Sequence, residues 1–232
     1  PATPDVCTAA VLIEGTEIPG EIQILSVSIN RELNRIPSAV VQILDGEASK
    51  STFALSNGDS FIPGKKIDIK LGYRSTNDSV FKGIIVKHSL KVRKNGSLLV
   101  AECRDEAVKM TGIAKNRYFA EKKDSDIMEE IIGDYGLQKD VTATTPDLKE
   151  VTQYNATDWD FLLCRAEANG MVVNVKDGKV TVAAPSTGSE VVSVEYGSTL
   201  LELDAEIDAR KQGKGIKATS WDHAAQSLVE VE

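Results

Sequence analysis

Residues 9–105 consist of one short apolar run after another, each separated from the next by turn residues. Apolar residues alternate within 22–29, and a one-residue slip at 25–26 predicts a bulge or a strand covered on both faces. Asn95-Gly96 is a strong signal for a two-residue hairpin turn, because both positions tolerate a positive φ. Several short strands with regular turn signals predict a small barrel or sandwich.

The remaining strands of this region follow the same pattern, at 10–13, 39–44, 67–71, 80–92 and 98–103. The run at 80–92 is long for one strand, and Gly83 inside it marks a bend, since glycine lets a strand kink. Residues 56–64 are rich in glycine and polar residues and predict a loop. Aromatic residues make up only 5% of the chain, so the core must consist mainly of aliphatic side chains.

After residue 105 the apolar spacing becomes helical. Apolar residues between 127 and 135 recur at helical intervals, and Gly136 ends the run. Asp126 with Glu129 three residues later has the form of an N-terminal capping pair, with Asp124 or Ser125 as alternative caps.

A second helix begins at Thr157, which is followed three residues later by Asp160. One apolar face recurs at helical spacing, formed by Trp159, Leu162, Leu163 and Ala166. Asn169-Gly170 ends the helix, since either residue can take the left-handed conformation that a helix end needs. Residues 171–175 and 180–182 then predict a hairpin around the turn at 176–179.

Residues 185–189 read as a linker, after which strands are expected at 191–194, 200–207 and 215–219. An independently stable sheet usually needs three or more strands. The short tract up to residue 232 therefore looks like the start of a domain, and we expect the natural polypeptide to continue.

Charge and cysteine content exclude several classes of protein. With 27 Lys and Arg against 35 Asp and Glu, the formal charge of −8 argues against nucleic-acid recognition or an anionic lipid partner. Cys7, Cys103 and Cys164 are far apart, so we expect no disulfide framework and a reducing compartment. No apolar run approaches the ~20 residues of a membrane-spanning segment.

No arrangement typical of catalysis is present, so we expect no enzyme and no catalytic, cofactor-binding or metal-binding residues. The nucleophile elbow, the phosphate loop and zinc or calcium spacings are all missing. His88 stands alone within a predicted strand. His223 follows Asp222, and an Asp-His pair can orient a general base, but no motif ties a nucleophile to it. Trp159 is expected to be buried, whereas Trp221 stays a candidate for stacking on a sugar or a base.

Several segments together resemble a known family. The sequences at 57–64, 67–73, 81–85 and 99–105 resemble the first barrel of Vgr-type proteins, the spike-hub family similar to the central baseplate hub of contractile phage tails. The string TDWDFLL at 157–163 is similar to the helix that precedes the small hairpin of that family. The resemblance spans nearly the whole chain.

The resemblance implies a mainly β fold with an α+β insertion: two related β-barrel tube domains, the second incomplete, flanking a helix plus β-hairpin domain. The expected boundaries are 1–105 for the first barrel, 106–186 for the insertion and 187–232 for the start of the second barrel. The chain departs from full-length members because it has no recognisable oligonucleotide-fold domain and no repetitive β-helix spike.

The function implied by the resemblance is that of a structural hub subunit in a type VI secretion or phage-tail-like machine. Three subunits would form a ring that adapts a hexameric tail tube to a threefold spike. The implied partners are an Hcp-like tail-tube protein, the spike tip and baseplate proteins. Assembly would take place in the bacterial cytoplasm, before export or release. Two alternatives remain: a carbohydrate- or peptide-binding β module that uses Trp221, and an unrecognised enzyme that uses His223.

Overall fold

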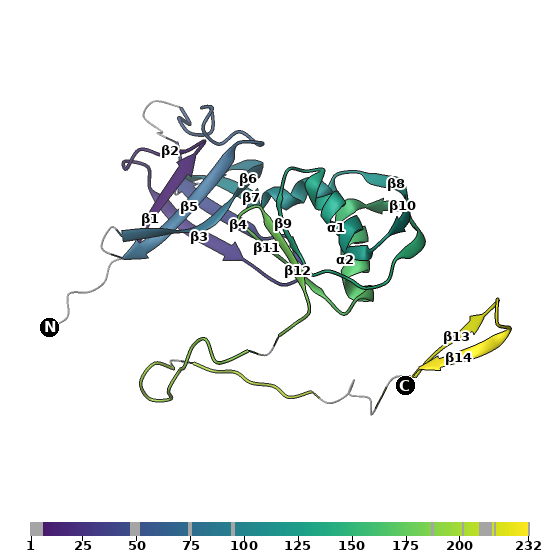
Figure 1. Cartoon of the computed structure of the whole chain (residues 1–232). Helices are drawn as coiled ribbons and strands as arrows, with labels where there is room; N and C mark the ends of the chain where they lie inside the picture. Colours follow the sequence, from purple (N-terminus) through teal and green to yellow (C-terminus); the bar gives the residue numbers. More distant parts are fainter. Residues whose placement is uncertain are drawn as a thin grey trace. The chain divides into compact units, whose positions relative to one another are not determined.

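The chain is mainly β and divides into two compact units, Pro1–Ser186 and Thr187–Glu232 (Figure 1). The structure, a computed structural model, describes residues 7–46, 52–73, 76–93, 96–186, 188–200, 202–208, 215 and 217–231. No helix among these residues is long and apolar enough to cross a bilayer.

A seven-stranded antiparallel sheet forms the N-terminal half of the first unit and curls around one core (Figure 1). We call this curled sheet the barrel; its end strands, β2 and β3, are not paired with each other in the described residues. The strand order is β2-β1-β5-β6-β7-β4-β3. The strands are β1 (Cys7–Ile13), β2 (Thr16–Glu17), β3 (Ile24–Asn30), β4 (Ser38–Leu44), β5 (Lys66–Tyr73), β6 (Thr76–Arg93) and β7 (Gly96–Arg104). Every strand predicted from the sequence in this region is therefore confirmed.

The irregularities predicted in this sheet are present. The pairing of β3 with β4 shifts register between Ile24 and Ser26, which confirms the predicted bulge. Strand β6 pairs with β5 through its first half and with β7 through its second half. At Gly83 a Cβ atom would lie 2.2 Å from the carbonyl oxygen of Arg104, so only glycine permits this close approach of two strands. The β6–β7 hairpin is also confirmed, with Arg93 opposite Gly96, although Asn95 lies outside the described residues.

The C-terminal half of the first unit is α+β. It contains the 3-10 helix η1 (Glu106–Thr111), β8 (Ala114–Lys122), α1 (Asp124–Gly133), β9 (Gln138–Val141), β10 (Leu148–Thr157), α2 (Asp158–Ala168), β11 (Val172–Lys176) and β12 (Lys179–Ala183). Strands β8 and β10 form an antiparallel pair, while β12 joins β11 antiparallel and β9 parallel. The predicted helices and the β11–β12 hairpin are confirmed.

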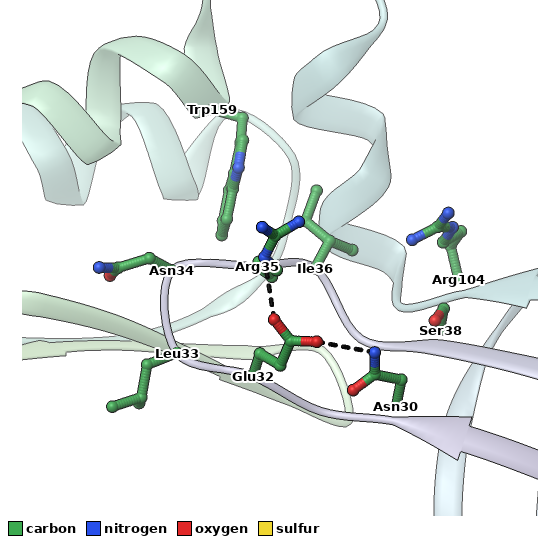
Figure 2. Close-up of a pocket in the computed structure, with 9 residues that line it drawn as sticks. All are labelled: Asn30, Glu32, Leu33, Asn34, Arg35, Ile36, Ser38, Arg104 and Trp159. Atoms are coloured by element: carbon green, nitrogen blue, oxygen red, sulfur yellow. Dashed lines mark hydrogen bonds and ion pairs between the residues drawn. The ribbon is translucent and has the colours of Figure 1, made fainter. Parts of the chain in front are cut away.

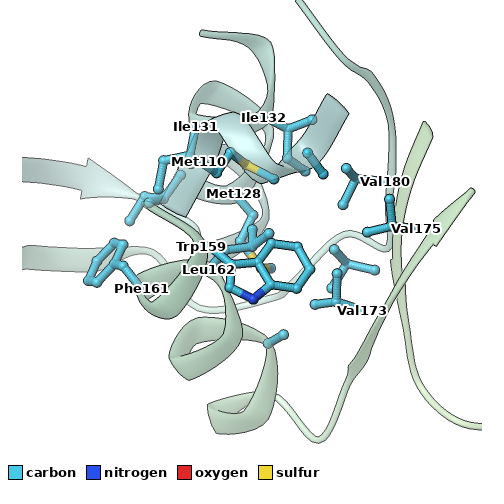
Figure 3. Packing of buried hydrophobic residues seen from close by; sticks show 14 of the residues in the cluster. Met110, Met128, Ile131, Ile132, Trp159, Phe161, Leu162, Val173, Val175 and Val180 are labelled. Carbon is cyan, nitrogen blue, oxygen red and sulfur yellow. The ribbon is translucent and has the colours of Figure 1, made fainter. Parts of the chain in front are cut away.

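The two helices and the hairpin enclose a second apolar core (Figure 3). The fully or nearly fully buried side chains come from both helices and from β11 and β12, and they include Met128, Ile131, Ile132, Leu162, Val173, Val175 and Val180. Trp159 is only 6% exposed, which confirms its predicted burial. The apolar face of α2 therefore acts as core, as its spacing indicates.

The start of α2 is capped by Thr157, as predicted. The backbone N–H of Asp160 donates to Thr157 Oγ1 at 3.1 Å, and Thr157 Oγ1 also hydrogen-bonds Asp160 Oδ2 at 2.6 Å. We expect Thr157→Ala to lower the free energy of unfolding by about 1 kcal/mol, because one orphan N–H of the first turn loses its acceptor. Urea denaturation measures the change. Thr157→Ser keeps the acceptor oxygen and should stay close to wild type; an equal loss in both variants would contradict the capping role.

The predicted cap of α1 is wrong. The residue at the N-cap position is Lys123, which makes no side-chain capping bond, so neither Asp126 with Glu129 nor the alternatives Asp124 and Ser125 cap this helix. Asp124 instead accepts from Arg165 Nε at 2.6 Å and Nη2 at 2.8 Å. A bidentate pair with an arginine is stronger than a capping bond, so the carboxylate faces α2 and not its own helix.

In the second unit the described residues form one antiparallel hairpin, β13 (Ala218–Asp222) with β14 (Ser227–Val231). The strand predicted at 191–194 is wrong, and the described part of 200–207 is also not a strand. All described residues of this unit except Leu200 are exposed, so no core holds additional strands in place. A second barrel and the three predicted domain boundaries stay predictions.

Candidate functional site

The turn of the β11–β12 hairpin connects the α+β half of the first unit to the barrel. Asp177 Oδ1 accepts from the guanidinium of Arg31 at 3.2 Å and from the backbone N–H of Lys82 at 3.1 Å. Arg31 also donates to the carbonyl oxygen of Val80. The next residue, Gly178, donates its N–H to Asp105 Oδ2 at 3.0 Å. We call this set of contacts the hairpin junction.

Asp105 is the buried centre of the hairpin junction, with 1% of its surface exposed. Its second oxygen accepts from the N–H of Ala107 at 3.0 Å and so begins η1. Burial raises the pKa of Asp105 above its usual value, while the two backbone N–H groups partly oppose this rise. One carboxylate therefore fixes both the end of the barrel and the start of the α+β half.

The loop between β3 and β4 makes a second connection. Asn34 adopts a positive φ of 60° and pairs with Val173 of β11 through two bonds of 2.8 Å. In these bonds the Asn34 N–H donates to the Val173 carbonyl, and the Val173 N–H donates to Asn34 Oδ1. Ile36, two residues later, packs against the core of the helices. The barrel and the α+β half thus share apolar as well as polar contacts.

A pocket of about 630 Å³ lies beside this loop, between the barrel and α2 (Figure 2). Arg35 Nε pairs with Glu32 Oε2 at 2.9 Å, and Asn30 Nδ2 donates to Glu32 Oε1 at 2.8 Å. The Arg104 side chain is exposed and makes no hydrogen bond or ion pair with any other residue that the structure describes. Trp159 points from α2 toward the loop (Figure 2). The lining of the pocket therefore includes the guanidinium groups of Arg35 and Arg104 and the ring of Trp159.

A second polar cluster is buried under α2. Asp158, fully buried, accepts from Lys115 Nζ at 2.6 Å, Tyr135 OH at 2.7 Å and Gln153 Nε2 at 2.8 Å. Burial raises the pKa of Asp158, but the hydrogen bonds outweigh it and hold the pKa below its usual value. The hydrogen bond to Asp158 also stabilises the charged form of Lys115 and so raises the pKa of Lys115. Both groups are charged at neutral pH, so the cluster acts as an internal ion pair and not as a proton-transfer site.

The residues singled out for chemistry lie in different units of the chain, and each has its own surroundings. His88 lies on β6 opposite Ala101. His223 lies in the exposed turn after β13, where Asp222 Oδ1 accepts from the N–H groups of Ala224 at 2.8 Å and Ala225 at 3.1 Å. The Asp222 carboxylate therefore stabilises the turn. Nowhere in the described ranges do three His, Cys, Asp or Glu side chains gather as metal ligands would.

The cysteines have different environments. All three are free thiols, with Cys7 and Cys164 exposed and Cys103 buried. Burial raises the pKa of the Cys103 thiol to about 12, so it stays protonated and unreactive at neutral pH.

Over residues 3–232 the chain matches the family model described as the Alg8 N-terminal domain. No curated protein sequence matches it. Among solved structures, the chain is similar to the 43 kDa tail protein of prophage MuSo2 from Shewanella oneidensis, with a TM-score of 0.70 at 13% identity. The alignment covers 97% of this chain and 69% of that protein.

A tail protein from Neisseria meningitidis has a TM-score of 0.67 at 16% identity, covering 97% of this chain and 67% of the other. An Escherichia coli component of the type VI secretion system has a TM-score of 0.59 at 14% identity, covering 78% of this chain and 50% of the other. The expected phage-tail type of fold is therefore confirmed. Because the family model spans nearly all of the sequence, the chain belongs to the Alg8 N-terminal domain family, and it has the fold of phage tail and type VI secretion proteins.

Proposed function

We propose that the protein is a structural, non-enzymatic subunit at the junction of tube and spike in a contractile injection machine. The observation that carries the proposal is the similarity to two phage tail proteins over 97% of the chain. The hairpin junction supports it, because a load-transmitting part needs its barrel and its α+β half held at a fixed angle. The Asp158 cluster supports the non-enzymatic part of the proposal, because the Asp158 carboxylate already accepts hydrogen bonds from side chains of the protein itself.

In this role three subunits form a ring that adapts a hexameric tail tube to a threefold spike. The partners are an Hcp-like tube protein, the spike tip and baseplate proteins. Assembly with them takes place in the bacterial cytoplasm, before the apparatus is exported or released. The similarity to a type VI secretion component makes that system one candidate, and the similarity to the two tail proteins makes a phage-tail-like particle the other.

The test is assembly. The natural protein, co-expressed with the tube and spike proteins encoded beside it, should purify as a complex with three copies of the subunit per spike. Native mass spectrometry gives the copy number and electron microscopy of single particles gives the symmetry. A subunit that stays monomeric in the presence of all these partners would refute the ring.

A second candidate is a carbohydrate- or peptide-binding role for Trp221, which is 53% exposed and lies opposite Leu228 on the β13–β14 hairpin. Exposed tryptophan faces suit stacking on sugar rings. Glycan-array binding that disappears in Trp221→Ala, with assembly unaffected, would favour this role over the structural one.

A further inference from the structure

We propose that the pocket beside Trp159 binds an acidic peptide segment of a partner protein through Arg104 and Arg35. The proposal goes beyond the structural role above and does not depend on it. It rests on charge, on the apolar side chains that share the pocket, and on its size.

The residues that line the pocket include two arginines, Arg35 and Arg104, and one glutamate, Glu32, so the lining carries an excess of positive charge. Arg31, Arg117 and Arg165 each hold a carboxylate, whereas the guanidinium of Arg104 holds none among the described residues. The planar guanidinium presents paired N–H donors that match the two oxygens of a carboxylate.

Arg35 can also bind an incoming carboxylate, although it already pairs with Glu32. Its ion pair with Glu32 is exposed on both sides, with 75% of the Arg35 side chain and 49% of the Glu32 side chain open to water. Such an exposed pair is weak, about 0–1 kcal/mol, so an incoming carboxylate can recruit Arg35 without a large penalty.

Apolar side chains in the same pocket point to a peptide. Leu33 lines the pocket with 57% of its surface exposed, whereas Ile36 is half-buried and Trp159 is only 6% exposed. The volume of about 630 Å³ is far larger than an inorganic anion fills and lies within the range of organic-ligand sites. A short extended segment with apolar residues between its acidic residues satisfies both the arginines and Leu33.

Trp159 provides the readout. In the Trp221→Phe background it is the remaining tryptophan, and its emission should shift when the peptide acetyl-ELDLE-amide is titrated into the full chain. The matched peptide acetyl-QLNLQ-amide has the same shape without the charge and should bind at least about tenfold more weakly. Added salt should weaken binding of the acidic peptide only, because the attraction is screened.

Substitutions locate the site. Arg104→Gln and Arg35→Gln should each weaken binding, Arg104→Gln by about tenfold. Arg93→Gln, an exposed arginine at the far end of β6, should leave binding unchanged. Thermal unfolding of each variant controls for folding, and Arg104→Lys, which keeps the charge but loses the paired donors, should retain part of the affinity.

Three results would overturn the proposal: equal binding of the two peptides, equal loss in Arg93→Gln and Arg104→Gln, or full displacement of the acidic peptide by equimolar inorganic phosphate. The last result would assign the pocket to small anions instead. A tenfold preference for the acidic peptide that depends on Arg104 and not on Arg93 would establish it.

Discussion

Replacing Asp105 by alanine is expected to lower the free energy of unfolding by about 3 kcal/mol, because two backbone N–H groups lose their acceptor at a buried site. One is the N–H of Ala107, which begins η1, and the other is the N–H of Gly178 in the hairpin turn. Asp105→Asn keeps one acceptor oxygen but places an NH₂ group against the other donor, so its loss should be about half as large.

Urea denaturation gives the size of the effect, and hydrogen exchange shows where it acts. In Asp105→Ala the Gly178 amide should exchange faster, since its only acceptor is removed. Asp140→Ala is the matched control, because Asp140 makes only an exposed ion pair with Lys179 and should change stability by less than about 0.5 kcal/mol. If Asp105→Ala unfolds at the same urea concentration as Asp140→Ala, Asp105 does not hold the two halves together.

Asp158→Asn is expected to cost about 3 kcal/mol at neutral pH, because the fully buried carboxylate accepts three hydrogen bonds that an asparagine can replace only in part. Lys115, Tyr135 and Gln153 all donate to this carboxylate, and an asparagine cannot accept from all three.

The effect should depend on pH in a defined direction. The pKa of Asp158 is lower in the folded state than in the unfolded state. Its contribution is therefore present above the unfolded pKa and is lost as the pH falls through the folded pKa. The difference between wild type and Asp158→Asn should be largest at about pH 7 and shrink below about pH 4. Denaturation at both ends of this range, with the exposed Asp147→Asn as control, measures it; a difference that grows on acidification would contradict the ion pair.

Much of the fold follows from local pattern. The barrel strands and the α2–β11–β12 unit were predictable because each buries one face, so apolar residues alternate or recur at helical spacing. Strands β8, β9 and β10 were not predicted. In the β8–β10 pair only one face touches the core, through Phe119 and Val151, and most other positions are polar. A two-stranded ribbon of this kind leaves little periodic signal.

The pocket could not have been predicted from the sequence. Arg35, Arg104 and Trp159 come from a loop, a strand end and a helix that are distant along the chain, so no spacing connects them. The cap of α1 was predicted wrongly for a similar reason, because the arginine that binds Asp124 is 41 residues away on another helix. Local rules assign a carboxylate to its own helix unless a distant arginine is known to compete for it.

The bond between Asn34 and Val173 spans 139 residues and has a consequence for biosynthesis. A ribosome releases β1 to β7 well before β11 exists, so the barrel can close while Asn34 in its 31–37 loop still lacks its partner Val173. During that interval Ile36, whose apolar contacts lie on the helices, is open to water and to other nascent chains. Translation itself thus sets an order of events in which docking of the β11–β12 hairpin follows closure of the barrel, and slowing elongation between residues 105 and 173 would prolong exposure to chaperones.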